Sequence, residues 1–174
     1  RCRLVGSEMC IRDRLYVEAE NKFGRGSNEM NFFWQKVNEQ DSLNQLEVVS
    51  LLEEHGWLGK NVVGEKGNAA LWLVVQHAHI SFQEKYLPLL RESVAKGESR
   101  GNHLALLEDR VNMHNNRPQI YGSQIIRDEK TGQNIFYEIF EPEYVNKRRA
   151  EVGLGPIEAY AKRMGVEWNI EQKD

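Results

Sequence analysis

The stretch KGNAALWLVVQHAHI, which covers Lys66–Ile80, decides the fold class of this chain. Its apolar residues recur at helical spacing and cover nearly the whole circumference of a helix; they are Ala69, Ala70, Leu71, Leu73, Val74 and Val75. A helix that is apolar on nearly every side is normally buried. We therefore predict a central core helix here, which carries the polar residues Gln76 and His77 toward its end.

Helical patterns flank this segment on both sides. Further helices are expected over residues 31–40, 42–55, 81–96 and 102–113. Ser42 stands three residues before Gln45, a spacing typical of a capping box, so a new helix is predicted to begin there. Pro88 lies inside another of these segments and predicts a kink or a break.

The period of the pattern changes in the last third of the chain. Residues Gln119–Ile126 and Asn134–Phe140 alternate and are separated by turn residues, which predicts a β-hairpin. Two short helices, over 143–152 and 156–165, are each expected to stop at a glycine. We predict an α+β fold, mainly α-helical, as a single domain with a helical core and one β-hairpin followed by short C-terminal helices. The expected organisation is a lead-in over residues 15–40, a globular domain over 41–166 and a tail over 167–174.

The first fourteen residues, RCRLVGSEMCIRDR, differ from the rest of the chain. They show no sustained period and resemble the sequencing-adapter read-through found in proteins translated from metagenomic assemblies, a kind of segment that is set aside before fold reasoning. The alternative is a genuine N-terminal arm. Both cysteines, Cys2 and Cys10, lie in this segment, so no disulfide or thiolate site is expected beyond it. We expect that the native N-terminus is missing, so the absence of a signal peptide is uninformative; the localisation stays open, with the cytoplasm favoured.

The charge balance narrows the class of partner. The whole chain has a net charge of −3, and without the first fourteen residues 19 basic face 24 acidic side chains, a net of −5. A mildly acidic chain argues against nucleic acid as a partner. No apolar run reaches the ~20 residues that span a bilayer. The expected partner is a small molecule or a peptide, and the basic run over 147–149 is expected to be a solvated helix face.

His77 is the first candidate site residue. Histidine is the side chain most easily tuned to act as acid or base near neutral pH, so His77 is the candidate general base and Gln76 a candidate substrate-binding residue. The alternative is a core histidine satisfied by a carbonyl or a carboxylate. His77 and His79 lie about 200° apart around a helix, and no third ligand stands at a useful spacing. We therefore expect no metal and no cofactor.

Asp109 and Arg110 are the second candidate pair. Adjacent helical residues do not face each other, so each needs its own partner. In the catalytic interpretation Asp109 orients His77, as a carboxylate does in a triad, and Arg110 binds an anionic group of the substrate. In the structural interpretation the pair pins the helix to the hairpin or to the C-terminal helices.

The third candidate set follows in the predicted first strand of the hairpin. Gln119, Tyr121 and Ser123 alternate and would point to one side of the strand, while Gln124 lies on the other side or at a bulge beside Gly122. Glutamine and tyrosine bind polar ligands by hydrogen bonds, so Gln119, Tyr121 and Gln124 are candidate substrate-binding residues. The alternative is the solvated face of an ordinary hairpin.

These motifs together resemble a bacterial family catalogued as domain of unknown function 6624. The resemblance covers roughly residues 50–160 and rests on the following segments: Gly56-Trp57, Val75-Gln76-His77-Ala78, 105–110, 117–124 and 148–154. It implies a common fold and a focus on His77 and the other candidate residues, but no reaction. His79 stands where the family often has an acid, and Ser123 stands where it usually has threonine.

Two functions are compatible with these residues. In the first, the protein is a metal-independent hydrolase or transferase that acts on a small polar or anionic substrate with His77 as general base. No serine or cysteine stands in a nucleophile motif, which disfavours covalent catalysis. In the second, the protein is a non-catalytic ligand-binding or protein-interaction domain, in which the same polar residues form a structural network.

Overall fold

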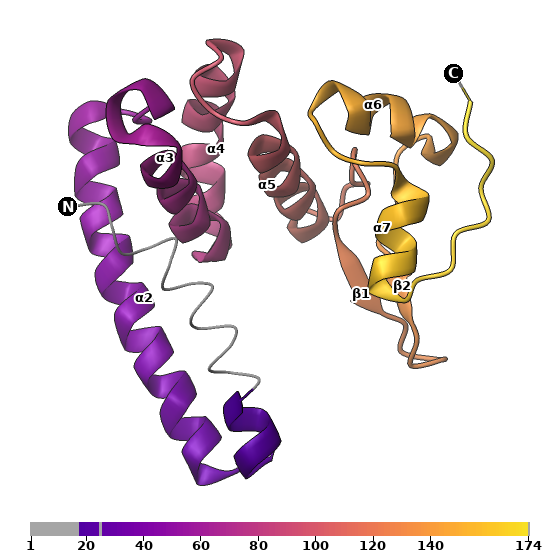
Figure 1. Ribbon diagram of the computed structural model, residues 1–174, viewed down its shortest axis with the longest axis horizontal. Coiled ribbons are helices and arrows are strands. Elements are labelled where there is room, and N and C mark those ends of the chain that lie inside the picture. The colour runs from indigo at the N-terminus through magenta and orange to yellow at the C-terminus, as the bar shows by residue number, and fades with distance from the viewer. Residues whose placement is uncertain (1–17, 25, 174) are drawn as a thin grey trace. The chain divides into compact units, whose positions relative to one another are not determined.

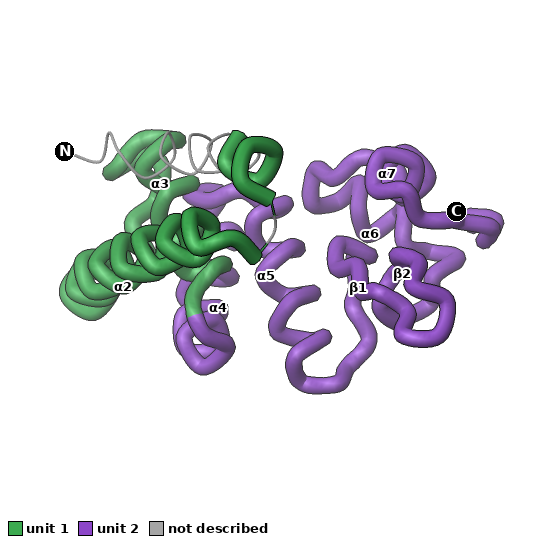
Figure 2. The backbone as a smooth tube through the Cα atoms, turned by 90° about the horizontal axis from the view of Figure 1, so that it is seen from below, with its two compact units in different colours: residues 1–78 green, residues 79–174 purple. Residues whose placement is uncertain are grey.

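Two long helices account for most of the first of two compact units, residues 1–78 (Figure 2). The computed structural model describes residues 18–24 and 26–173, so the expectations for the first fourteen residues lie outside the described part. Helix α2 spans Asn28–His55 and helix α3 spans Lys60–His77, and the two pack against each other (Figure 1).

Helix α2 is one continuous helix where the sequence predicted two. Its N-cap is Ser27, whose hydroxyl accepts a hydrogen bond from the Met30 amide at 3.2 Å. Ser42 lies in the helix interior and donates its Oγ to the Asn38 carbonyl at 2.8 Å, so the predicted capping box is wrong. No glycine or proline interrupts residues 28–55, and nothing therefore forces a break. Gly56 ends the helix as expected.

Helix α3 is the expected core helix, with Leu71, Val74 and Val75 buried. It begins earlier than predicted, and Gly64 interrupts it with a φ of 73° and a ψ of 168°, a conformation that favours glycine. It also ends earlier, at His77, because Ala78 is extended.

The second unit, residues 79–174, begins with two packed helices, α4 over Ile80–Ala95 and α5 over Gly101–His114. Leu90 and Leu107 are fully buried in this part of the core. Pro88 lies inside α4 without ending it, so the predicted break does not occur. The proline is exposed, and water can satisfy the carbonyl that it leaves without a donor.

The hairpin is shorter than predicted. Strands β1 over Ile125–Arg127 and β2 over Asn134–Phe136 pair in antiparallel register, with Ile126 opposite Ile135. Asp128 closes the turn between them by accepting hydrogen bonds from the amides of residues 130 and 131 at 2.7 and 2.8 Å. Residues 119–124, expected to extend the first strand, form a loop instead.

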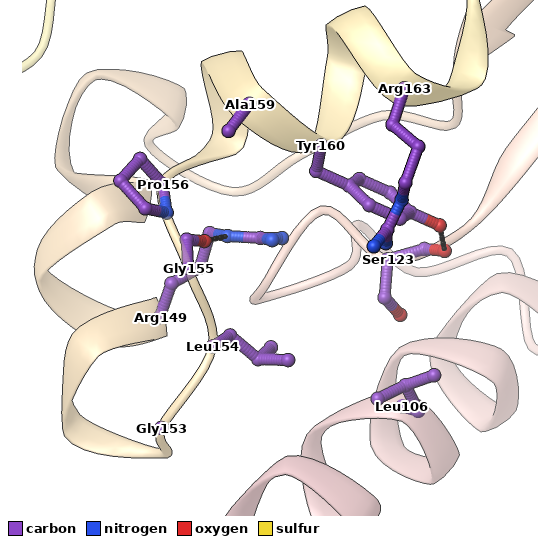
Figure 3. A pocket seen from close by; sticks show the side chains of 10 residues that line it. All are labelled: Leu106, Ser123, Arg149, Gly153, Leu154, Gly155, Pro156, Ala159, Tyr160 and Arg163. Atoms are coloured by element: carbon purple, nitrogen blue, oxygen red, sulfur yellow. Dashed lines mark hydrogen bonds between the residues drawn. The ribbon is translucent and has the colours of Figure 1, made fainter.

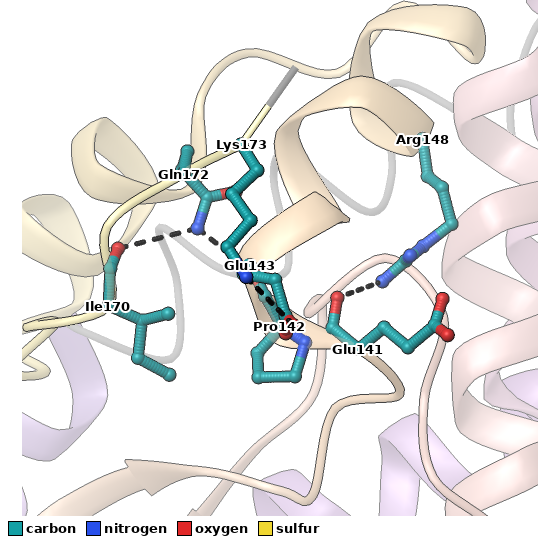
Figure 4. A network of polar contacts seen from close by, with 7 residues as sticks. All are labelled: Glu141, Pro142, Glu143, Arg148, Ile170, Gln172 and Lys173. Atoms are coloured by element: carbon teal, nitrogen blue, oxygen red, sulfur yellow. Dashed lines mark hydrogen bonds and ion pairs between the residues drawn. The ribbon is translucent and has the colours of Figure 1, made fainter.

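Short helices complete the unit: the 3-10 helix η1 over Pro142–Tyr144, α6 over Val145–Glu151 and α7 over Ile157–Met164. Gly165 ends α7 in the left-handed conformation. The C-terminal tail returns to η1, where Gln172 donates to the Pro142 carbonyl at 3.0 Å and the Lys173 amide donates to the Glu143 carbonyl at 2.7 Å (Figure 4).

The observed architecture confirms the predicted fold class. It is α+β and mainly α-helical, with one β-hairpin followed by short C-terminal helices. The domain boundaries at residues 41 and 166 stay a prediction. In the described ranges, no helix combines the length and the apolar character needed to cross a membrane.

Candidate functional site

The centre of the second unit is the loop Arg117–Gln124, which we call the polar loop. Gln119 pairs with the segment after β2, where its amide donates to the Glu138 carbonyl at 2.8 Å and its carbonyl accepts from the Phe140 amide at 2.9 Å. The buried backbone groups that follow it are not paired in this way and need other hydrogen-bond partners. Side chains from α5, α6 and α7 supply these partners. The alternation of polar residues over 119–124 was predicted to mark one side of a strand, but in the structure it belongs to a loop held by side chains of neighbouring helices.

Asp109 of α5 holds the amides of the polar loop. Its side chain is fully buried, with Oδ1 accepting hydrogen bonds from the Ile120 and Tyr121 amides at 2.7 and 3.0 Å. Oδ2 accepts from the Ser123 amide at 2.9 Å. Burial raises the pKa of Asp109, and the amide donors of Tyr121, Ser123 and Ile120 oppose that rise. Both carboxylate oxygens are thus engaged by the backbone of the loop.

The side chain of Gln119 connects the two ends of the polar loop and links the loop to the hairpin. It is fully buried, and its Oε1 accepts from the Gln124 amide at 2.7 Å. Its Nε2 donates to the carbonyls of Gln124 and Tyr137 at 3.0 and 2.8 Å. These side-chain bonds add to the backbone hydrogen bonds that Gln119 makes with Glu138 and Phe140.

Gln124 and Arg110 meet at the end of the loop. Gln124 is buried and donates to the Ser123 hydroxyl at 2.9 Å and to the Leu106 carbonyl at 3.5 Å. Arg110 donates to the Gln124 Oε1 at 3.4 Å, and burial lowers the pKa of the Arg110 guanidinium. Arg110 is half-buried.

Two arginines of α6 hold the carbonyls of the polar loop. Arg148 donates to the carbonyls of Ile120, Phe140 and Glu141, of which the first is at 2.9 Å and the last at 3.1 Å (Figure 4). Arg149 donates to the Tyr121 carbonyl at 2.7 Å, and only 3% of the residue is exposed. The prediction of a solvated basic face is therefore wrong for Arg149, because its guanidinium replaces solvent as the partner of a buried loop.

Gly122 allows the polar loop to approach its neighbours closely. Its φ is 66°, and an added Cβ would lie 2.5 Å from the Ile157 Cδ1. Both the conformation and the close contact therefore require glycine.

A cavity of about 290 Å³ opens beside the polar loop, entirely within the second unit (Figure 3). Its polar lining comes from Ser123, Arg149, Tyr160 and Arg163. Its apolar lining includes Leu106, Leu154, Pro156 and Ala159. The guanidinium groups of both arginines project into the space between the loop and α7 (Figure 3).

Tyr160 connects the two arginines. Its hydroxyl donates to the Ser123 carbonyl at 3.0 Å, and burial raises its pKa. The guanidinium carbon of Arg149 lies 5.2 Å from the ring centroid, and that of Arg163 lies 5.1 Å from it. Both contacts are cation–π interactions. Sequence reasoning missed Tyr160 and Arg163, although their three-residue spacing on α7 places them on one helix face.

Five of the seven predicted site residues lie together in the second unit; they are Asp109, Arg110, Gln119, Tyr121 and Gln124. Tyr121 is half-buried, and burial together with the nearby carboxylates of Glu108 and Asp109 raises its pKa to about 12. The phenol is therefore neutral at physiological pH.

Gln76 and His77 belong to the first unit, at the end of α3. Gln76 is buried, whereas the side chain of His77 is exposed. The pairing of His77 with Asp109 stays a prediction. Within residues 18–24 and 26–173, no three His, Cys, Asp or Glu side chains are grouped as ligands of a metal ion.

Comparison with known proteins identifies one family. A family of unknown function, DUF6624, has a model that matches residues 20–173. No curated protein and no solved structure shows a significant match.

Proposed function

This chain belongs to the family of unknown function DUF6624, and we propose that it is a non-catalytic domain that binds a small molecule. In this proposal the polar residues of α5 and the polar loop form a structural network. The network fixes one wall of the cavity beside α7, and the ligand occupies that cavity.

The hydrogen bonds of Asp109 carry this proposal. An ionised carboxylate has about four lone-pair positions, and Asp109 uses its two oxygens for the amides of Ile120, Tyr121 and Ser123. An acid that orients a histidine must offer a lone pair to the imidazole N–H, and here the fourth position, on Oδ2, faces the Tyr121 amide at 3.3 Å. Both oxygens thus support the backbone of the loop, and removing the carboxylate would leave buried amides without an acceptor, at a cost of about 1–3 kcal/mol each.

The cavity gives the network a use beyond stability. Ser123 is fixed by Asp109 through its amide and by Tyr160 through its carbonyl, and it lines the cavity. Arg149 also lines the cavity while it holds the Tyr121 carbonyl. A wall held from both sides is pre-organised, which lowers the entropic cost of binding a ligand.

The catalytic alternative rests on one observation, the exposure of His77 at the end of α3 beside buried Gln76. An accessible imidazole is available as a general base for a hydrolase or a transferase. In this alternative Arg110 binds an anionic group of the substrate.

One experiment separates the two functions. The purified protein is incubated with a metabolite mixture that includes phosphate esters, carboxylic esters and amides, and turnover and melting temperature are both measured. The proposal expects a ligand-dependent rise in melting temperature without turnover.

Two variants sharpen the result. His77→Ala removes the candidate base, and His114→Ala removes another exposed histidine as the matched control. Turnover by the wild type that disappears in His77→Ala and persists in His114→Ala, with both variants folded, would establish catalysis and overturn the binding proposal.

A further inference from the structure

Arg149 is a buried cation whose partners are all backbone carbonyls. It donates to the carbonyls of Gly155 at 2.6 Å, Tyr121 at 2.7 Å and Gly122 at 3.4 Å. Across the part of the chain that the structure describes, no carboxylate oxygen lies within 4.0 Å of this guanidinium. A buried charge is costly unless an opposite charge compensates it, and the carboxylates of Asp109 and Glu158 favour the charged form of Arg149 only from a distance, without an ion pair.

A second cation increases this imbalance. Arg163 is exposed at the mouth of the cavity, and its guanidinium stacks on the ring of Tyr160 that also contacts Arg149. Burial lowers the pKa of Arg149 and the charge of Arg163 lowers it further, whereas Tyr160, Asp109 and Glu158 oppose this fall. Both guanidinium groups line the same cavity and project into the space between the polar loop and α7, so an anion bound in that cavity lies near both of them (Figure 3).

The acidic side chains near Arg149 are already engaged. Asp109 accepts the amides of the polar loop. Glu158 accepts hydrogen bonds from the Asn146 amide group at 3.1 and 2.9 Å. The first turn of α7, which starts at Ile157 beside the cavity, adds a partial positive charge. The two guanidinium groups and this helix terminus therefore place positive charge along the cavity lining, in a chain whose net charge is −3.

We infer that the cavity binds the oxyanion of a small organic molecule, a carboxylate or a phosphate, between Arg149 and Arg163. This inference rests on the binding function proposed above and specifies the class of ligand. The apolar side chains of Leu106, Leu154 and Ala159 would contact a short hydrocarbon body attached to that oxyanion. The volume of about 290 Å³ is at the lower end of ligand pockets, which begin at about 300 Å³, so the ligand is a small acid rather than a peptide.

The test is a titration of the ¹⁵N-labelled full chain, followed through the amide resonances of Ser123 and of residues 153–155. The probes are inorganic phosphate and butyrate, each at an ionic strength matched with potassium chloride. We expect saturable shifts of these resonances with at least one probe. A response to phosphate alone, or to butyrate alone, identifies which oxyanion the ligand carries.

Arg163→Gln is the main variant because, among the residues that the structure describes, no backbone carbonyl accepts a hydrogen bond from the Arg163 side chain. Because the variant loses a charge-assisted hydrogen bond to the anion, its Kd for the probe should rise by at least about tenfold. Lys162→Gln removes one charge from the same helix outside the cavity lining, and its Kd should change by less than about twofold.

Two results would overturn the inference: no saturable shift with either probe, or equal weakening in the Arg163 and Lys162 variants. Neither result bears on whether the protein is catalytic, which the His77 variant tests separately.

Discussion

Replacing Asp109 with asparagine should destabilise the protein strongly. Asparagine has nearly the same shape as aspartate but keeps one acceptor oxygen and places an amide group where the other oxygen was. In the native site Oδ1 serves the amides of Ile120 and Tyr121, and Oδ2 serves that of Ser123. Whichever way the new side chain turns, at least one buried backbone N–H faces another donor.

The size of the effect follows from these contacts. A hydrogen bond to a charged group contributes about 1.5–3 kcal/mol, and an unsatisfied buried donor costs about 1–3 kcal/mol. Since Asp109 is fully buried, water cannot replace the lost acceptor. We expect a loss of roughly 2–4 kcal/mol in the free energy of unfolding, which for a chain of this length lowers Tm by roughly 5–15 °C.

Thermal and urea unfolding followed by circular dichroism measure this loss. Asp128→Asn is the matched control, because Asp128 also accepts two backbone amides, but in an exposed turn. Its Tm should fall by less than about 2 °C. If Asp109→Asn melts within 2 °C of the wild type, or no lower than Asp128→Asn, the network around the polar loop does not have the energetic role assigned to it.

Two further predictions concern the same loop. Tyr121, with its pKa raised to about 12, contributes stability that is present below pH 10 and is lost as the pH rises through about 12. Tyr121→Phe should therefore lose less stability at alkaline pH than the wild type, as measured by urea unfolding, whereas the control Tyr144→Phe should follow the wild type. If the two variants show the same pH dependence of unfolding, the prediction is wrong. Gly122→Ala should lower Tm by more than Gly132→Ala in parallel melting curves. Both positions have positive φ and share that penalty, but the new Cβ at Gly122 would lie 2.5 Å from the Ile157 Cδ1, whereas at Gly132 its nearest neighbour is 3.7 Å away. If Tm falls equally in the two variants, the loop accommodates the added Cβ at Gly122 without a measurable loss of stability.

Much of the helical architecture could be predicted because it depends on local pattern. The all-round apolar run that ends near Val75 is buried as expected, and Gly56 and Gly165 end helices as glycines commonly do. The turn at Asp128 was also predicted, since its side chain bonds amides two and three residues away. The start of a helix was predicted wrongly at Ser42, where a capping pattern lies inside an uninterrupted helix.

The candidate site was predicted less completely. Asp109, Gln119 and Gln124 were identified as important polar residues, and the structure brings them together. Their partners were not predictable, because the same alternation of polar residues is compatible with one face of a hairpin and with a loop held by side chains of other helices. Arg149 was read as solvated, since nothing within its own helix shows that the carbonyl of Tyr121 lies within reach.

The sequence by itself determined the fold class, the core helix, the glycines that end α2 and α7, and the turn of the hairpin, because these depend on interactions within a few residues. Only the tertiary structure decided that residues 119–124 form a loop and that a cavity with two arginines lies beside it. The physical reason is the cost of burying polar groups. The carbonyl of Ser123 is satisfied by Tyr160, 37 residues along the chain, and such a partner exists only once the helices have packed.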